Sequence, residues 1–269
     1  MRSRHSPRAE ESYRRHHVGT VDYFTSRYGH GDASMVVYRF GCVGERNRAD
    51  FVLVHGIGVS ARMYGPTAAA LAERGDVYLV DLPGYGRSPR PNVDLTIPGH
   101  AGILGDFLTD SELDHPVVVG HSMGTQVVVE LAASFPDQVD HIALIAPVVV
   151  PDARKLPKLT ALLMQDGLRE PPAVMAIAVN DYLFRAGIPY MVQQTPHLLG
   201  NCMEDRAPLV SAQTLVICGE DDPIVPLDWG REVAGLFAHG TFAAVPGPHA
   251  SMFAAPERIA KLLEEHAAR

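Results

Sequence analysis

Short runs of apolar residues alternate with longer stretches of helical spacing from about residue 50 to residue 147. Apolar runs of this length are typical of buried β-strands, and the spacing between them fits helices. Strands are predicted at residues 51–55, 77–82, 116–120 and 141–147, and helices at residues 62–74, 99–109 and 122–134. This order predicts a mostly parallel sheet with helices on both faces, and residues 20–29 and 33–40 predict an antiparallel hairpin at its edge.

The alternation breaks over residues 148–212, which are rich in proline and in short apolar helical pieces. It resumes at residue 214 with a strand, a helix, a second strand and a final helix. We therefore predict an α/β core formed by residues 20–147 and 213–269, with a helical cap of residues 148–212 inserted after the sixth strand. Residues 1–19 are charged and are predicted to be a disordered tail.

The composition allows a large core and excludes several classes of function. The chain has 269 residues, 46% of them hydrophobic, and a formal net charge of −8. This charge argues against nucleic acid as a partner, because phosphate binding requires a basic surface. Its three cysteines form no CxxC pair, so a reducing, cytoplasmic location is expected. No signal-like segment or apolar run of membrane-spanning length occurs, which predicts no stable membrane insertion, and nothing in the pattern specifies an oligomeric state.

The glycine-rich stretch HGIGVSA fits two kinds of site. Gly56, Gly58 and Ala61 match the G-x-G-x-x-A fingerprint of a dinucleotide site, and Asp81 ends the next strand. However, His55 stands where that fingerprint has an apolar residue, and a hairpin precedes the motif. We therefore favour an oxyanion loop, whose free backbone N–H groups each stabilise a negative oxygen by about 3 kcal/mol in the transition state.

The stretch GHSMG places Ser122 between Gly120 and Gly124, directly after a predicted strand and directly before a predicted helix. This G-x-S-x-G pattern in a strand-turn-helix context is typical of a nucleophile elbow. The glycines are needed because the tight turn strains the serine backbone and leaves no room for flanking side chains. Ser122 is therefore the predicted nucleophile.

A serine hydroxyl becomes a good nucleophile only when a base takes its proton and an acid orients that base. GEDDPIVP follows one downstream strand and PGPHASM follows the next, and they supply Asp222 and then His249. The order serine, aspartate, histidine, each at the carboxyl end of a strand, is the order expected of this architecture. Asp221 and Asp152 are alternatives for the acid.

Five segments in this order, HGIG, DLPGYGRS, GHSMG, GEDDPIVP and GPHASM, resemble the α/β-hydrolase superfamily, close to its capped esterase- and lipase-like branch. The resemblance covers about residues 20–265. It implies an α/β-hydrolase fold, and the family spacing G-x-x-D-x-x-x-P favours Asp222 as the acid. It also implies an oxyanion hole formed by the backbone N–H groups of Ile57 and Met123.

Other residues near these motifs receive structural interpretations. His55 and His121 are expected to hydrogen-bond backbone around the active turns, and Asp81 and Arg87 to brace a loop. Thr125 departs from the GHSMGG form common in relatives, and it is expected to change packing but not mechanism. The chain has 13 histidines but no HExxH or HxH pair, so neither a metal nor another cofactor is expected.

The predicted reaction is hydrolysis of a carboxylic ester or thioester of a hydrophobic small molecule through an acyl-enzyme. Carbon–carbon bond hydrolases of the ring-cleavage type use the same serine triad and are an alternative. Further alternative functions of this fold are a perhydrolase, an acyltransferase or cyclase of secondary metabolism, and a ligand receptor. Met164, Tyr182, Phe184 and Tyr190 of the cap are candidates for an apolar roof over Ser122, and packing of the cap onto the core is the alternative role of each.

Overall fold

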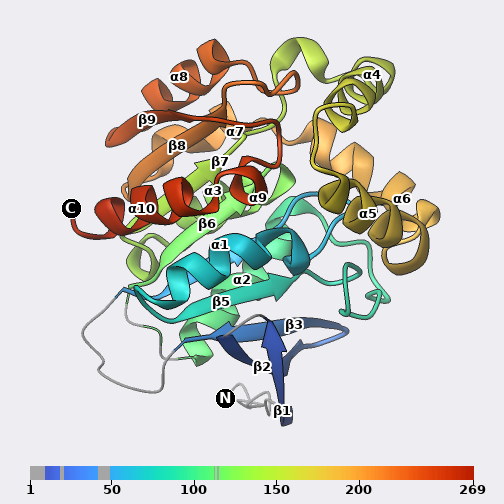
Figure 1. The fold of residues 1–269 in the computed structure, drawn as a ribbon, viewed down its shortest axis with the longest axis vertical. Helices are drawn as coiled ribbons and strands as arrows, with labels where there is room; N and C mark the ends of the chain where they lie inside the picture. Colours follow the sequence, from blue (N-terminus) through green and yellow to red (C-terminus); the bar gives the residue numbers. More distant parts are fainter. Residues whose placement is uncertain (1–9, 19–20, 42–48, 112, 114) are drawn as a thin grey trace, which may run out of the picture.

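The computed structural model describes residues 10–18, 21–41, 49–111, 113 and 115–269. Its strands are β1 (Glu10–Val18), β2 (Val21–His30), β3 (Ala33–Phe40), β4 (Phe51–Val54), β5 (Val77–Asp81), β6 (Val117–His121), β7 (His141–Ile145), β8 (Gln213–Gly219) and β9 (Gly240–Val245). Within the described residues they form one sheet in the order β1-β2-β3-β5-β4-β6-β7-β8-β9 (Figure 1). β1 to β3 pair antiparallel, as does β3 with β5, and the pairings from β5 to β9 are parallel. The predicted mostly parallel sheet with an antiparallel edge is confirmed.

Helices cover both faces of this sheet (Figure 1). The core helices are α1 (Gly65–Ala72), α2 (Ile97–Asp110), α3 (Met123–Ser134), α8 (Leu227–Leu236), α9 (Ser251–Ala254) and α10 (Pro256–Ala267), with 3-10 turns η1 (Ala61–Tyr64) and η2 (Pro136–Gln138). α1 packs against α10 on one face, and α2 packs against α3 on the other. β4 and β6 are buried at every position because helices lie over both of their faces, which explains their continuous apolar runs.

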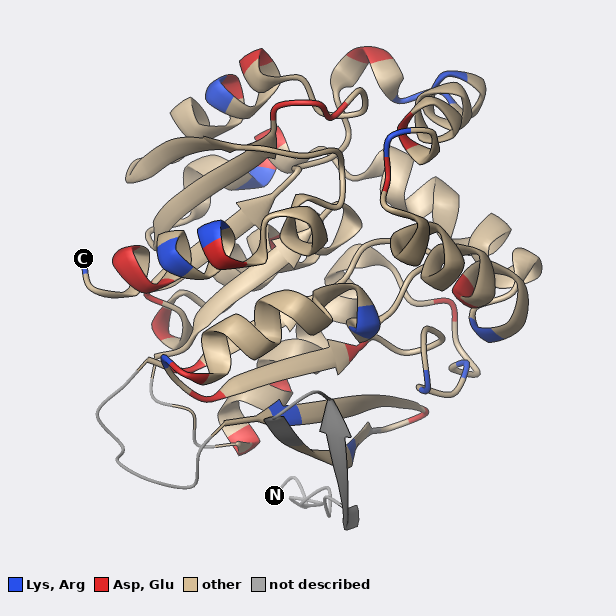
Figure 2. Cartoon of the chain, in the orientation of Figure 1, with Lys and Arg blue, Asp and Glu red and all other residues tan. Residues whose placement is uncertain are grey.

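Residues 148–212, called the cap from here on, are helical and lie between β7 and β8. The cap contains η3 (Pro151–Ala153), α4 (Leu156–Gly167), α5 (Pro172–Asn180), the π-helical turn η4 (Asp181–Arg185), α6 (Ile188–Gly200), α7 (Met203–Arg206) and η5 (Ala207–Leu209). α5 and α6 contain no Lys, Arg, Asp or Glu, so this part of the cap is almost free of charge (Figure 2). Among the described residues, no helix has both the length and the apolar character needed to cross a bilayer.

The N-terminal segment differs from the sequence prediction. Residues 10–18 were expected to belong to a disordered tail, but they form β1, which pairs antiparallel with β2. An edge strand is held by backbone hydrogen bonds to its single neighbour, so it needs no apolar pattern, and its charged sequence concealed it. The cap therefore follows the seventh strand rather than the sixth, and residues 1–9 and 19 lie outside the described residues.

Candidate active site

Three residues of the predicted motifs lie at one edge of the sheet. β6, β7, β8 and β9 run parallel, so their carboxyl ends lie side by side. Ser122, Asp222 and His249 lie in the loops that follow β6, β8 and β9, and their exposed fractions are 8%, 7% and 7%. The edge where ligands bind in open α/β sheets thus carries three buried polar side chains.

Ser122 occupies a strained turn at the N-terminus of α3. Its φ of 52° lies in the left-handed region, which a serine seldom adopts. Two sets of hydrogen bonds hold this conformation. The Ser122 backbone N–H donates to the carbonyl oxygen of Ile145 at 3.0 Å, and its carbonyl oxygen accepts the Thr125 hydroxyl at 2.6 Å. Thr125, which departs from the family pattern, therefore braces the turn.

The glycines on either side of Ser122 allow close backbone approach. A Cβ on Gly120 would lie 2.4 Å from the carbonyl oxygen of Gly124, and a Cβ on Gly124 would lie 2.4 Å from that of Val54. No side chain fits at either position without moving a strand or the helix. The G-x-S-x-G spacing is thus explained by packing at the turn.

Gly124→Ala should lower the free energy of unfolding by about 3 kcal/mol, because the added methyl group meets backbone atoms that cannot rotate away. Gly235→Ala in α8 is the matched control, since nothing lies within 4 Å of the position of its Cβ. This control should be neutral or more stable by about 0.5 kcal/mol. Urea denaturation measures both, and equal stability of the two variants would contradict the packing explanation.

His249 and Asp222 form a buried hydrogen-bonded pair. His249 Nδ1–H donates to Asp222 Oδ2 at 2.8 Å, and Asp222 Oδ1 accepts the backbone N–H groups of Ile224 and Val225 at 2.7 and 3.1 Å. The structure thus brings Asp222 to His249, whereas Asp221 is exposed. This tautomer leaves Nε2 of His249 free to accept a proton. No hydrogen bond joins Ser122 to His249 among the described contacts, and catalytic contacts of this kind commonly tighten only when substrate binds.

The protonation of His249 reflects opposing effects. Burial lowers the pKa of His249, but the charge of Asp222, the hydrogen bond to it and the charges of Asp166 and Glu170 in the cap raise this pKa to about 9. The imidazole of His249 therefore binds a proton more tightly than a free histidine does.

The HGIG loop lies beside Ser122. A Cβ on Gly56 would lie 2.9 Å from Cβ of Ser122, so the loop backbone passes directly over the turn. Among the contacts of the described residues, the backbone N–H groups of Ile57 and Met123 have no acceptor. An oxyanion hole formed by these two groups stays a prediction.

His55 and His121 have the structural roles predicted for them. His55 accepts the Leu82 backbone N–H at Nε2 and donates from Nδ1 to the carbonyl oxygen of Gly56. His121 donates from Nε2 to the carbonyl oxygen of His249 at 3.1 Å. Burial lowers the pKa of both imidazoles, so they are neutral supports of the two loops.

The fold of the chain is shared with known proteins. Residues 51–262 match the model of the alpha/beta hydrolase family. The chain belongs to this family.

Individual known proteins are similar to the chain to different extents. The monoacylglycerol lipase of Mycolicibacterium smegmatis is 28% identical over 78% of this chain and 84% of its own length. An uncharacterised protein of Mycobacterium tuberculosis is 34% identical over 95 residues, which are 35% of this chain and 28% of that protein. The solved enol-lactonase of Burkholderia xenovorans LB400 shares the fold, with a TM-score of 0.76 and 21% identity over 90% of this chain and all of that one.

The four cap residues proposed to contact substrate occupy different environments in this alpha/beta hydrolase. Tyr190 is fully buried beside Gly84 and donates to the carbonyl oxygen of Pro83 at 2.9 Å, so its position is that of a packing residue and does not support contact with substrate. Met164 and Phe184 are 72% and 77% exposed. Contact of these two residues with a substrate at Ser122 stays a prediction.

Tyr182 is the one of these four that contacts the HGIG loop. Its ring lies against Gly58, and its hydroxyl donates to the carbonyl oxygen of Ile57 at 3.5 Å. The cap therefore contacts the loop that carries one of the predicted oxyanion donors.

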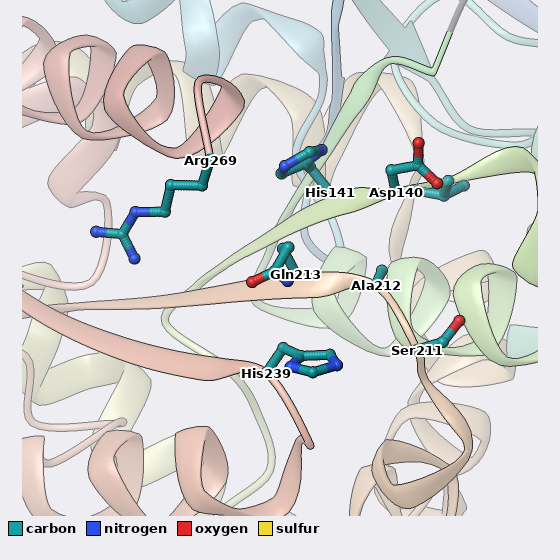
Figure 3. A pocket seen from close by; sticks show the side chains of 8 residues that line it. Asp140, His141, Ser211, Ala212, Gln213, His239 and Arg269 are labelled. Carbon is teal, nitrogen blue, oxygen red and sulfur yellow. The ribbon is translucent and has the colours of Figure 1, made fainter.

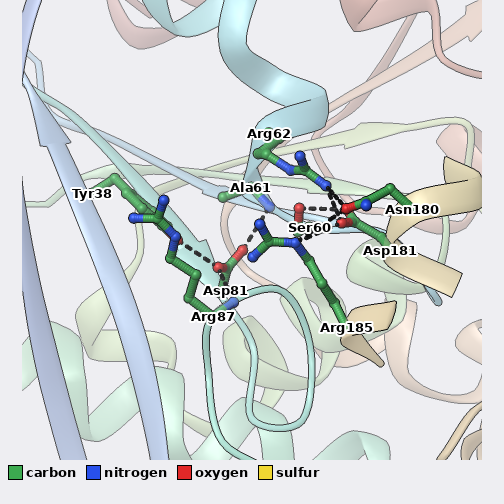
Figure 4. Close-up of polar contacts among 9 residues, drawn as sticks. All are labelled: Tyr38, Ser60, Ala61, Arg62, Asp81, Arg87, Asn180, Asp181 and Arg185. Atoms are coloured by element: carbon green, nitrogen blue, oxygen red, sulfur yellow. Dashed lines mark hydrogen bonds and ion pairs between the residues drawn. The ribbon is translucent and has the colours of Figure 1, made fainter. Parts of the chain in front are cut away.

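Two buried aspartates brace the loops around the site (Figure 4). Asp81 accepts the backbone N–H groups of Ala61 and Arg87 at 2.8 Å each and the Tyr38 hydroxyl at 2.7 Å, which confirms the bracing role expected of it. Asp181 in the cap accepts the Ser60 hydroxyl at 2.6 Å and pairs with Arg62 and Arg185.

Sequence reasoning missed the two cap carboxyls nearest the histidine. Asp166, near the end of α4, accepts the His249 backbone N–H at 3.1 Å, and Glu170 accepts the Ala250 backbone N–H at 2.7 Å. The available signal was an acid pair four residues apart in the segment LLMQDGLRE. Such a pair gives no hint of a partner about 80 residues away.

A pocket lies at the end of the strands opposite to Ser122. Its volume is about 260 Å³, and it lies where β7 and β8 begin (Figure 3). Its lining residues are Val139, Asp140, His141, Ser211, Ala212, Gln213, His239 and Arg269. Across the described ranges, no group of three or more His, Cys, Asp or Glu side chains is placed to hold a metal ion.

Proposed function

We propose that the chain is a serine hydrolase that cleaves a carboxylic ester or thioester of a hydrophobic small molecule through an acyl-enzyme on Ser122. The observation that carries this proposal is the buried His249–Asp222 hydrogen bond at the sheet edge where Ser122 occupies its strained turn. A nucleophile, a base and an orienting acid at one edge are the parts that acyl transfer requires.

The chemistry follows from the position of each group. His249 Nε2 accepts the proton of the Ser122 hydroxyl as its oxygen attacks the acyl carbon. The backbone N–H groups of Ile57 and Met123 donate to the resulting oxyanion. Collapse of this intermediate breaks the bond to the leaving group, which takes the proton from His249. A water, deprotonated by His249, then releases the acid and restores Ser122, while Asp222 fixes the tautomer throughout.

Two uncharged helices of the cap support a hydrophobic substrate. α5 and α6 carry no charged residue, and Leu183, Phe184 and Ile188 expose more than half of their side-chain surface. An apolar surface next to a polar catalytic edge suits an acyl chain or ring attached to a reactive carbonyl. The similarity to a monoacylglycerol lipase agrees with such a substrate.

A substrate panel should test the reaction class. We expect turnover of p-nitrophenyl esters or acyl-CoA thioesters, with longer acyl chains preferred over acetyl. Ser211→Ala, an exposed serine at the far pocket, should be as active as the wild type. If only a ring-fission product turns over, the carbon–carbon bond hydrolase replaces the ester hydrolase. If none of these compounds turns over, the proposed function is wrong.

A further inference from the structure

The cap reaches the loop of His249 through two carboxyl groups. Asp166 Oδ1 accepts the His249 backbone N–H at 3.1 Å, and Glu170 Oε1 accepts the backbone N–H of Ala250 at 2.7 Å. Asp166 is 5% exposed, so this contact is buried between cap and core. Two neighbouring peptide groups of the histidine loop are thus held by one short segment of the cap.

Asp166 and Glu170 differ from the buried cap acid Asp181 in their charged partners. Asp181 is paired with Arg62 and Arg185, whereas no Lys or Arg pairs with Asp166 or Glu170 within the described residues. Instead, the charge of Asp166 helps to raise the pKa of Glu170. Burial raises the pKa of both groups, that of Glu170 to about 8, so Glu170 keeps its proton at neutral pH.

Four titratable groups surround His249. Asp222 approaches from the loop after β8, His121 from the end of β6, and Asp166 and Glu170 from the cap. His121 is neutral. Asp222 belongs to the core, and Asp166 and Glu170 are the acids by which the cap adds negative charge around His249.

We propose that Asp166 and Glu170 are positioning residues through which the cap holds the His249 loop and sets the charge of its imidazole. This inference rests on the proposed function, since it assigns a consequence to the protonation of the base. The negative charge of these carboxyls favours the protonated imidazole, so His249 keeps its proton more strongly than it would without them. The charge of these cap residues and the basicity of His249 are therefore coupled.

The pH dependence of kcat/KM tests this coupling. Activity should rise with pH as His249 loses its proton, and the midpoint should lie about 1 pH unit lower in Asp166→Asn than in the wild type. At pH 7 this shift corresponds to about a tenfold higher kcat/KM. Asparagine keeps an oxygen for the His249 backbone N–H and removes only the charge. Asp205→Asn, an exposed acid of α7, is the matched control and should leave the midpoint unchanged.

Glu170→Gln provides a second variant, because glutamine imitates the protonated carboxyl and keeps an oxygen for the Ala250 backbone N–H. It should shift the midpoint in the same direction, since Glu170 is mostly ionised at about pH 9, where His249 titrates. An unchanged midpoint in both variants, with circular dichroism showing that both are folded, would overturn the proposal.

An NMR titration of His249 separates this inference from the proposed function. Histidine labelled with ¹³C reports the imidazole pKa directly, with His249→Ala used for assignment. We expect a lower pKa in Asp166→Asn whether or not an ester is hydrolysed. An inactive wild-type protein with this shift would reject the proposed function and keep the electrostatic contact. An active protein without the shift would reject only the inference.

The free energy of unfolding should depend on pH through Glu170 and His249. The pKa of Glu170 rises from its usual 4.5 to about 8 in the folded state, so the folded chain retains a proton that the unfolded chain loses over this interval. The free energy of unfolding should therefore fall as pH rises from about 5 to 8. The raised pKa of His249 acts in the same direction up to about pH 9. Glu170→Gln should flatten the dependence between pH 5 and 8 in urea denaturation, and a slope equal to that of the wild type would count against the buried carboxyl pair.

Discussion

Ser122→Ala should lower kcat/KM for a hydrolysed ester by about 10⁶-fold and leave the fold intact. The loss is this large because removing the nucleophile stops the covalent route, and only binding and the oxyanion donors remain. The fold should survive because the turn is held by the backbone N–H and carbonyl of Ser122, which alanine also has. Steady-state kinetics on a p-nitrophenyl ester, combined with thermal unfolding, measures both effects.

The controls for Ser122→Ala exclude contamination and misfolding. Ser211→Ala, purified in the same way, should keep the activity of the wild type. A melting temperature of Ser122→Ala within a few degrees of the wild type would show that the turn is intact. Residual activity near that of the wild type would rule out Ser122 as the nucleophile.

Asp222→Asn should lower kcat/KM by about 10⁴-fold. The carboxylate accepts Nδ1–H of His249 at 2.8 Å and is itself held by the backbone N–H groups of Ile224 and Val225. An amide in this position donates where a carboxylate accepts, so it favours the imidazole tautomer that cannot take the serine proton. The same kinetic assay measures this loss.

Asp221→Asn is the matched control for Asp222→Asn. The two residues are adjacent in GEDDPIVP, but Asp221 is exposed and Asp222 is buried against His249. We expect Asp221→Asn to be as active as the wild type. A large loss in Asp221→Asn with little loss in Asp222→Asn would move the acid to the neighbouring residue.

The parallel sheet and the three residues at its edge could be predicted because their signals are local. Apolar runs mark β4 to β9, and the residues around Ser122, Asp222 and His249 lie in turns directly after such runs. The topology of parallel strands then brings these turns together without any further information. This is why a five-residue pattern such as GHSMG could indicate both a position in the fold and a chemical role.

The features that could not be predicted depend on distant partners. β1 is paired through its backbone, so its side-chain pattern carried no signal. Tyr190 has the aromatic character of a substrate contact, and only the structure places it against Gly84 of the core. Asp166 and Glu170 contact a loop about 80 residues later in the chain, and no spacing rule connects a cap helix to that loop.

Fluorophosphonate labelling tests the central claim most directly, because it needs no knowledge of the substrate. The reagent reacts with a serine that a neighbouring base activates. We predict one adduct on the folded wild-type protein, mapped by peptide mass spectrometry to Ser122, absent from Ser122→Ala and strongly slowed in His249→Ala. A folded wild-type protein that gains no adduct, or gains it on another serine, would contradict the assignment of Ser122 as an activated nucleophile.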